Sequence, residues 1–219
     1  TIQNRTIADT TMTSTPALRS RLPEVGTTIF TVMSQLAVQH QAVNLGQGFP
    51  DFDCDARLQS LVAQAMREGH NQYALMTGVT ALREAIAAKT ERLYGHAYDP
   101  GTEITVSAGA TQAIMTAILA CVHPGDEVIA LEPCYDSYVP SVRLAGGVPV
   151  FVPLDAGDYA VPWDRVRAAI TPRTRLILLN SPHNPSGAVF SAADLDALEN
   201  LVRGTDILLL ADEVYEIGR

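Results

Sequence analysis

The chain has 219 residues, and 47% of them are hydrophobic, which is enough for a packed core. Its formal net charge of −9 excludes a nucleic acid as the expected partner, because proteins that bind nucleic acids concentrate Lys and Arg. Three widely spaced cysteines and five histidines without metal-ligand spacing predict neither a disulfide framework nor a metal site, and they fit a reducing, cytoplasmic location. No apolar run approaches the ~20 residues that span a bilayer, so we expect a soluble protein without membrane contact.

The N-terminal region begins with a polar tail and continues with one amphipathic segment. Residues 1–15 are rich in threonine and lack the apolar core of a signal peptide, so we expect a flexible tail. In the segment Ile29–Val38 the apolar residues recur at helical spacing and share one face. This pattern predicts a helix whose apolar face needs a covering partner.

Two further helices are predicted before residue 100. The first runs from Asp55 to Glu68 and is closed by Gly69, because glycine readily adopts the left-handed conformation that ends helices. After an irregular segment, the second runs from Val79 to Leu93 and is ended by Gly95. The residues of the first helix that we expect to face inward are Leu58, Leu61, Val62, Ala65 and Met66.

From Ile104 onward, apolar strands alternate with helices. This alternation predicts right-handed strand–helix–strand crossovers, and therefore an α/β fold with a mainly parallel sheet. The predicted strands are Ile104–Ser107, Glu127–Leu131, Val148–Val152, Leu176–Leu179 and Ile207–Ala211. The predicted helices are Ala110–Val122, Trp163–Ile170 and Ala192–Val202.

The last two predicted strands end in polar side chains. The turn after Leu179 contains two prolines and a glycine and places Asn184 at the carboxyl end of its strand, where open α/β sheets bind ligands. The following strand ends in Asp212, with Tyr215 three residues later. A carboxylate that terminates an apolar strand is drawn into a low-dielectric interior and needs a partner. A protonated ring nitrogen, an arginine or a helix N-terminus would each serve.

Two earlier segments are also candidates for a ligand site. The small residues Gly109, Ala110 and Thr111 lie where a strand meets a helix, so their N–H groups could hold a phosphate; a tight turn with a cap explains them equally well. Tyr135 could stack on a flat ligand, although ordinary packing beside Tyr138 is the simpler explanation for it alone. The absence of a GxGxxG pattern argues against a dinucleotide cofactor.

Taken together, these motifs resemble a known enzyme family. Ser107–Thr111, Glu132–Tyr138, Asn180–Gly187 and Ala211–Tyr215 are similar in order and spacing to the pyridoxal-phosphate-dependent aminotransferases of fold type I, class I/II. Asn44–Asp53 and Asn71–Gly78 resemble its methionine and kynurenine aminotransferase branch. The resemblance covers about residues 18 to 216 and implies a three-layer fold. It assigns residues 16–47 to an N-terminal arm and part of a small domain, and 48–219 to a cofactor-binding large domain that is incomplete at its C-terminus.

The resemblance implies a role for each candidate residue around pyridoxal 5′-phosphate. The backbone of Gly109–Thr111 would bind the phosphate, and Tyr135 would stack on the pyridine ring. Asn184 and Tyr215 would hydrogen-bond the phenolic oxygen of the ring, and Asp212 would keep its nitrogen protonated.

The same resemblance implies a homodimer and a transamination. Tyr73 would cross the dimer interface to the phosphate of the partner's cofactor, while Gly48 and Asn184 would bind the substrate carboxylate. The reaction would pass the amino group of an L-amino acid, methionine-like or aromatic, to a 2-oxo acid. A carbon–sulfur β-lyase acting on cysteine conjugates is an alternative, because the same cofactor supports both reactions.

The Schiff-base lysine of the family would follow the Ala211–Tyr215 segment, and the sequence contains no lysine there. Lys89, its only lysine, lies on the predicted helix Val79–Leu93, where we expect its stem to pack and its ammonium to reach water. No catalytic residue is therefore assigned, and we expect a fragment of a longer polypeptide that would be inactive alone. A non-catalytic relative that serves as a binding or regulatory module is the remaining alternative.

Overall fold

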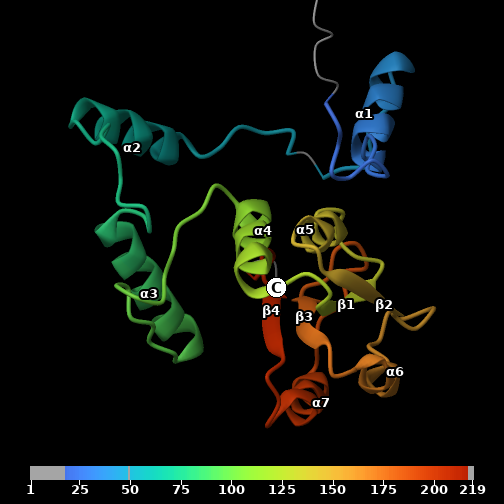
Figure 1. Cartoon of the computed structure of the whole chain (residues 1–219). Helices are drawn as coiled ribbons and strands as arrows, with labels where there is room; N and C mark the ends of the chain where they lie inside the picture. Colours follow the sequence, from blue (N-terminus) through green and yellow to red (C-terminus); the bar gives the residue numbers. More distant parts are fainter. Residues whose placement is uncertain (1–17, 49, 217–219) are drawn as a thin grey trace, which may run out of the picture.

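The computed structural model describes residues 18–48 and 50–216, so the predicted tail 1–15 lies outside the described residues. Helices and strands alternate after residue 109, as the sequence predicts (Figure 1). In chain order the elements are α1 (Ile29–Gln39), α2 (Ala56–Arg67), α3 (Thr80–Tyr94), α4 (Ala110–Cys121), β1 (Glu127–Glu132), α5 (Tyr138–Leu144), β2 (Val148–Pro153), α6 (Trp163–Ala169), β3 (Thr174–Asn180), α7 (Ala192–Val202) and β4 (Leu208–Asp212).

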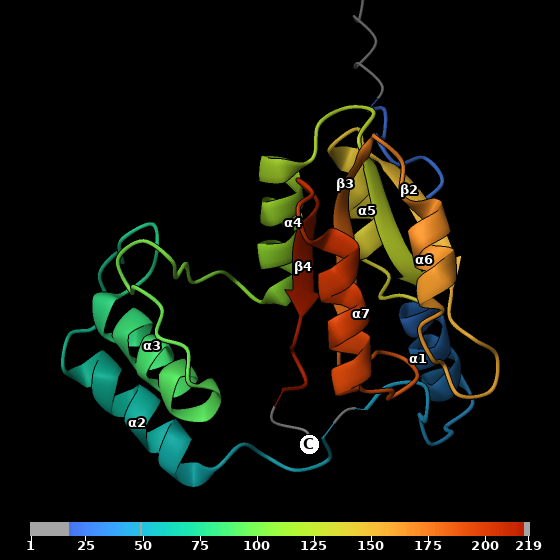
Figure 2. The same cartoon turned by 90° about the horizontal axis from the view of Figure 1, so that it is seen from below.

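The four strands form one parallel sheet in the order β2-β1-β3-β4. The chain passes from β1 to β2 in one direction through α5, and then returns through α6 and α7 on the opposite face to β3 and β4 (Figure 2). Reversal of direction together with a change of face is what right-handed crossovers require. The predicted α/β class and parallel sheet are therefore confirmed.

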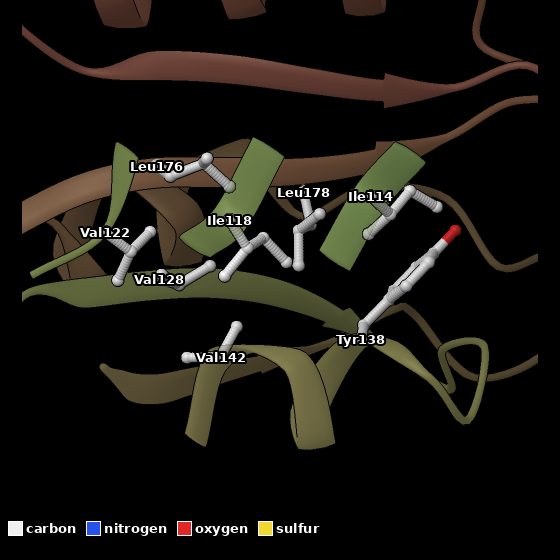
Figure 3. Packing of buried hydrophobic residues seen from close by; sticks show 8 residues of the cluster. All are labelled: Ile114, Ile118, Val122, Val128, Tyr138, Val142, Leu176 and Leu178. Carbon is white, nitrogen blue, oxygen red and sulfur yellow. The ribbon is translucent and has the colours of Figure 1, made fainter. Parts of the chain in front are cut away.

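Two hydrophobic cores flank the sheet because successive side chains of a strand point to opposite faces. Val128, Leu176 and Leu178 pack under α4 and α5, together with Ile118 of α4 and Val142 of α5 (Figure 3). The alternate residues of the same strands pack under α6 and α7; this second cluster contains Ile129, Leu131, Val152, Val166, Ile177, Leu179, Leu198 and Leu201. The result is the predicted three-layer arrangement.

Polar contacts hold helices α6 and α7 together. Ser191 caps α7, and Asp194 returns a hydrogen bond to the Ser191 backbone, which satisfies amide groups that a helix start leaves free. The other carboxylate oxygen of Asp194 accepts a 2.9 Å hydrogen bond from the indole Nε1 of Trp163, the first residue of α6. One side chain thus fastens α7 to α6.

Two sequence predictions about secondary structure are wrong. Residues 104–107 form no strand, because they lie beside the 75–78 loop and not on the sheet; the amide of Val106 donates to Thr77 O at 3.0 Å. Helix α5 is absent from the sequence prediction. It has only seven residues, and Ser137 at its N-cap makes no side-chain capping hydrogen bond, so the helical pattern is too short to be recognised from sequence.

The N-terminal helices do not join the sheet's cores. The apolar face of α1 is only partly covered in the described chain: Val32, Met33 and Leu36 are 39%, 44% and 40% exposed. Glu24, which precedes α1, pairs with Arg143 of α5 at 2.7 Å. The prediction that α2 turns its apolar residues inward is wrong for the described chain. Leu58, Leu61, Val62 and Met66 are each at least half exposed, because α2 lies away from the sheet (Figure 1).

Candidate functional site

A cavity of about 280 Å³ opens at the carboxyl edge of the sheet. It lies where β1 continues into α5 on one face and β3 continues into α7 on the other, which is the topological switch point at which open α/β sheets bind ligands. Its lining consists of Ala108, Gly109, Ala110, Thr111, Ile114, Tyr135, Asn180, Asn184, Asp212, Val214 and Tyr215. Every residue predicted to bind the cofactor lines this cavity, with the exception of Tyr73.

Asp212 is a buried carboxylate held by two donors. Only 9% of the residue is exposed. Its Oδ2 accepts a 2.6 Å hydrogen bond from the Tyr138 hydroxyl, and its Oδ1 accepts one from the Val214 amide at 3.2 Å. Burial, followed by the hydrogen bond to Asp212, raises the pKa of Tyr138 well above its usual value, so the phenol remains a protonated donor.

Within the described chain, Asp212 has a partner that the sequence interpretation did not name. In the described part of the chain neither an arginine nor a helix N-terminus hydrogen-bonds its carboxylate; Tyr138 takes that place. From the sequence, Tyr138 is interpreted as ordinary packing. Its place three residues after Tyr135 gives no signal, because only the fold brings the Tyr138 side chain, at the start of α5, to the end of β4.

Asn180 is a second residue that the sequence interpretation missed. It ends β3, pairs in register with Asp212 of β4, and is buried. Its Nδ2 donates to the Asp212 carbonyl at 2.8 Å, and its Oδ1 accepts from the Asn184 amide at 2.7 Å. Asn184 in turn donates from Nδ2 to the Tyr215 hydroxyl at 3.3 Å. A polar residue that closes an apolar strand was the signal available for Asn180.

The N-terminus of α4 faces the cavity without a side-chain cap. Gly109 is its N-cap residue and has a φ of +87°, a conformation that strains any residue with a Cβ atom. The first amides of a helix have no partner within the helix, and the helix dipole adds positive potential there. The segment Gly109–Thr111 therefore presents an anion-binding end to the cavity.

Tyr135 separates this cavity from a larger groove beside α1. The ring is half-buried and meets Tyr138 edge to face, with ring centroids 5.9 Å apart. The groove has a volume of about 680 Å³. It is lined by Thr28, Phe30, Thr31, Ser34, Gln35, Val38, Gln39, Gln47, Tyr135 and Asp136.

Three residues of the sequence interpretation lie elsewhere. Tyr73 is fully exposed in the loop before α3, and Gly48 is exposed and lines neither the cavity nor the groove. The Lys89 side chain is 36% exposed, and its ammonium pairs with Glu216, which also accepts from the Tyr94 hydroxyl at 2.9 Å. Lys89, Glu216 and Tyr94 do not line the cavity.

The donor set of the cavity fits pyridoxal phosphate. A phosphate needs the amide donors at the start of α4, a protonated ring nitrogen needs a buried carboxylate such as Asp212, and a flat ring needs an aromatic wall such as Tyr135. Among the described residues, no group of three or more His, Cys, Asp and Glu side chains is placed to hold a metal ion. No helix in ranges 18–48 and 50–216 has the length and apolar character to cross a membrane.

Comparison with known sequences gives one family. The family model for aminotransferase class I and II matches residues 40–218. A methionine aminotransferase from Escherichia coli strain K12 is 53% identical over 206 residues, which are 94% of this chain and 53% of the relative. A probable N-succinyldiaminopimelate aminotransferase, DapC, from Mycobacterium tuberculosis is 48% identical over 90% of this chain and 50% of its own length.

Solved structures agree with the sequence matches. YbdL from Escherichia coli, whose structure and reactivity identified a methionine aminotransferase function, superimposes with a TM-score of 0.89 at 52% identity, over 92% of this chain and 53% of that one. N-succinyldiaminopimelate aminotransferase from Mycobacterium tuberculosis superimposes with a TM-score of 0.86 at 48% identity, over 91% and 53% of the two chains. This chain thus spans about half the length of the curated relatives it matches.

Proposed function

Because the chain belongs to the class I and II aminotransferases, a family that depends on pyridoxal 5′-phosphate, we propose that it serves transamination between an L-amino acid and a 2-oxo acid. The observation that carries this proposal is the single cavity that joins the uncapped start of α4 to the buried carboxylate of Asp212. Since the chain spans about half of its relatives, the activity is proposed for the whole polypeptide.

The proposed cofactor contacts follow the chemistry of the cavity wall. The amides of Gly109–Thr111 would hold the phosphate, and the ring of Tyr135 would cover one face of the pyridine. Asn184 and Tyr215, already joined at 3.3 Å, would donate hydrogen bonds to the phenolic oxygen. When bound, the cofactor supplies an electron sink for the substrate's α-carbon.

Asp212 would hold a proton on the ring nitrogen. A carboxylate does this only if it stays close and is kept from bulk water, and the hydrogen bonds from Tyr138 and Val214 fix both oxygens. Asn180 fixes the backbone at the same point through the Asp212 carbonyl. We propose that these groups orient Asp212 before the cofactor arrives.

The groove beside α1 supports a substrate with an uncharged side chain. Its wall is made of neutral residues apart from Asp136, whose carboxylate would repel an acidic side chain. Phe30 and Val38 offer apolar surface of the kind that a methionine-like or aromatic amino acid requires. The exposed backbone of Gly48, next to groove residue Gln47, and Asn184 would bind the substrate carboxylate.

A homodimer is part of the proposal. Tyr73 is fully exposed and lines neither the cavity nor the groove of its own chain, so it would act only in the site of a partner subunit. The partly covered apolar face of α1 is compatible with further contacts in the assembled protein. The relatives reported above are aminotransferases, so the lyase and non-catalytic alternatives receive no support from them.

Absorbance titration with pyridoxal phosphate tests the cofactor site. We expect saturable binding by the protein, and a dissociation constant at least about tenfold higher for Asp212→Ala, because the ring nitrogen loses its charged partner. Asp196→Asn is the matched control, since Asp196 is exposed on α7. Binding that is absent, or equal in both variants, would contradict the proposal.

A panel of amino donors tests the substrate class. With the whole polypeptide as enzyme and a common 2-oxo acid as acceptor, methionine and phenylalanine should react with higher kcat/KM than aspartate. Asp136→Asn should narrow the difference, because it removes the negative charge from the groove. A preference for aspartate would contradict the assignment of a neutral side chain while leaving the cofactor site intact.

A further inference from the structure

His183 connects two loops that the chain reaches far apart in sequence. The residue is buried, with 6% exposed. Its Nδ1 lies 2.6 Å from the Ser186 hydroxyl in its own turn, and its Nε2 lies 3.0 Å from the carbonyl oxygen of Pro133. Pro133 follows β1, whereas His183 follows β3, so the imidazole ring bridges the ends of two neighbouring strands.

The two contacts determine the tautomer of the ring. A carbonyl oxygen only accepts hydrogen bonds, so the hydrogen of the neutral ring must lie on Nε2 to reach Pro133. Nδ1 is then an acceptor, and the Ser186 hydroxyl must donate to it. The Ser186 oxygen accepts in turn from the Ala188 amide at 3.2 Å. Burial lowers the pKa of His183, which favours this neutral form.

The bridged loops carry two walls of the cavity. Tyr135 lies two residues after Pro133, and Asn184 directly follows His183; both line the 280 Å³ cavity. The turn around Asn184 is itself closed by backbone hydrogen bonds from the His183 amide to Ala188 O at 2.8 Å and from the Gly187 amide to His183 O at 2.7 Å. A closed turn moves as a unit, so its attachment to Pro133 fixes where Asn184 stands relative to Tyr135.

We propose that His183, supported by Ser186, is a positioning residue that sets the spacing between Tyr135 and Asn184 across the cavity. The inference rests on the proposed function only in naming pyridoxal phosphate as the ligand that senses this spacing. A histidine that merely fills space would be replaced without loss by a residue of similar size. A histidine that joins the two loops must be replaced by one that keeps a donor and an acceptor.

Four variants separate these two roles. His183→Leu removes both hydrogen bonds, whereas His183→Gln keeps a donor and an acceptor on one side chain. Ser186→Ala removes the donor to Nδ1, and Ser186→Thr restores a hydroxyl. His123→Gln is the matched control, because His123 is exposed. Each protein is titrated with pyridoxal phosphate, and amide hydrogen exchange is measured over residues 134–138 and 183–188.

We expect the dissociation constant for pyridoxal phosphate to rise about tenfold in His183→Leu, the size expected when one to two hydrogen bonds no longer hold the site. It should stay within about threefold of the wild type in His183→Gln and Ser186→Thr. Amide hydrogen exchange should accelerate in both loops of His183→Leu. Faster exchange over residues 134–138 is the diagnostic result, because a loss of packing around His183 alone would affect only its own loop. The control should match the wild type.

Several results would overturn the proposal. Equal behaviour of His183→Leu and His183→Gln would do so, and so would unchanged exchange over residues 134–138 in a folded His183→Leu protein. If His183→Leu does not fold, two other measurements test the bridge. One compares pyridoxal phosphate binding by Ser186→Ala and Ser186→Thr. The other is nitrogen-15 NMR of the wild-type imidazole, because a hydrogen on Nδ1 is incompatible with the bridge. Failure of the wild type to bind pyridoxal phosphate overturns the proposed function. In that case, amide hydrogen exchange and the tautomer of the imidazole alone test whether His183 joins the two loops.

Discussion

Asp212 and Tyr138 form a buried polar pair whose hydrogen bond is short and shielded from water, at 2.6 Å with both residues nearly inaccessible. Such a pair is stable because each partner satisfies the other, and an unsatisfied member would be costly. The burial of Asp212 is predictable from the apolar strand before it. The role of Tyr138 is not, because the contact spans 74 positions and depends on where α5 packs.

Tyr138→Phe tests this pair. The substitution keeps the ring in its core position but leaves Oδ2 of Asp212 without its donor, so the free energy of unfolding should fall by about 1–3 kcal/mol. Urea denaturation measures the change, and Tyr159→Phe is the control because Tyr159 is exposed. Equal stability of the two variants would mean that the hydrogen bond contributes nothing in solution.

The cysteines provide a second test at this scale. Burial, together with the carboxylates of Glu132 and Asp136, raises the pKa of the Cys134 thiol to about 11, whereas Cys54 is exposed. Thiolates are the reactive form, so iodoacetamide at a pH of about 8 should label Cys54 well before Cys134 in the folded protein. Peptide mass spectrometry in the presence and absence of urea checks this order. Equal labelling rates without urea would contradict it.

At the scale of elements, the predictable parts are those whose own pattern suffices. Strands β1 and β3 each contain a continuous apolar run, and both strands and helix α7 are found from sequence. Helix α5 and the irregular segment 104–107 are not, because a short helix without a cap and an apolar segment beside a loop depend on neighbours. Long helices and strands can therefore be predicted from their own sequence, whereas the conformation of short segments depends on tertiary contacts.

Helix α4 allows a matched comparison of its two faces. Ile118 is fully buried against the sheet, whereas its neighbour Leu119 is 48% exposed. Ile118→Ala should lower the free energy of unfolding by about 2–5 kcal/mol, and Leu119→Ala should cost less than about 1 kcal/mol. Chemical denaturation of both variants measures the difference. Similar losses would show that α4 does not pack on the sheet as described.

At the scale of the whole molecule, the site assembles because parallel strands end at one edge. That rule makes the grouping of Tyr135, Asn184 and Asp212 predictable from the amino-acid sequence. Tyr73 and Gly48 line neither the cavity nor the groove, and the roles proposed for them require contacts from outside the described chain. The half-exposed apolar residues of α2 likewise show that the inward face expected from periodicity needs a neighbour to become buried.

Mixing two inactive variants tests the proposed dimer. If Tyr73 serves the partner's site, a protomer with Tyr73→Ala and one with Asp212→Asn should together rebuild one complete site per mixed dimer. Random exchange of protomers should then restore roughly a quarter of the wild-type activity, since half of the dimers are mixed. Each variant alone is the control, and sedimentation velocity reports the assembly. No recovery in a dimeric mixture would place Tyr73 outside the partner's site.

The wall residues of the cavity and of the groove beside α1 overlap at one position, Tyr135. Mutations can therefore change the lining of the cavity and the lining of the groove almost independently. If the groove binds the substrate side chain as proposed, substitutions along α1 would change substrate preference without altering the strand ends that carry Asp212 and Asn184. Solved aminotransferases named for methionine, N-succinyldiaminopimelate and aspartate superimpose on this chain, as expected if one fold carries different substrate-binding surfaces. For a laboratory evolution of substrate range, libraries belong on α1.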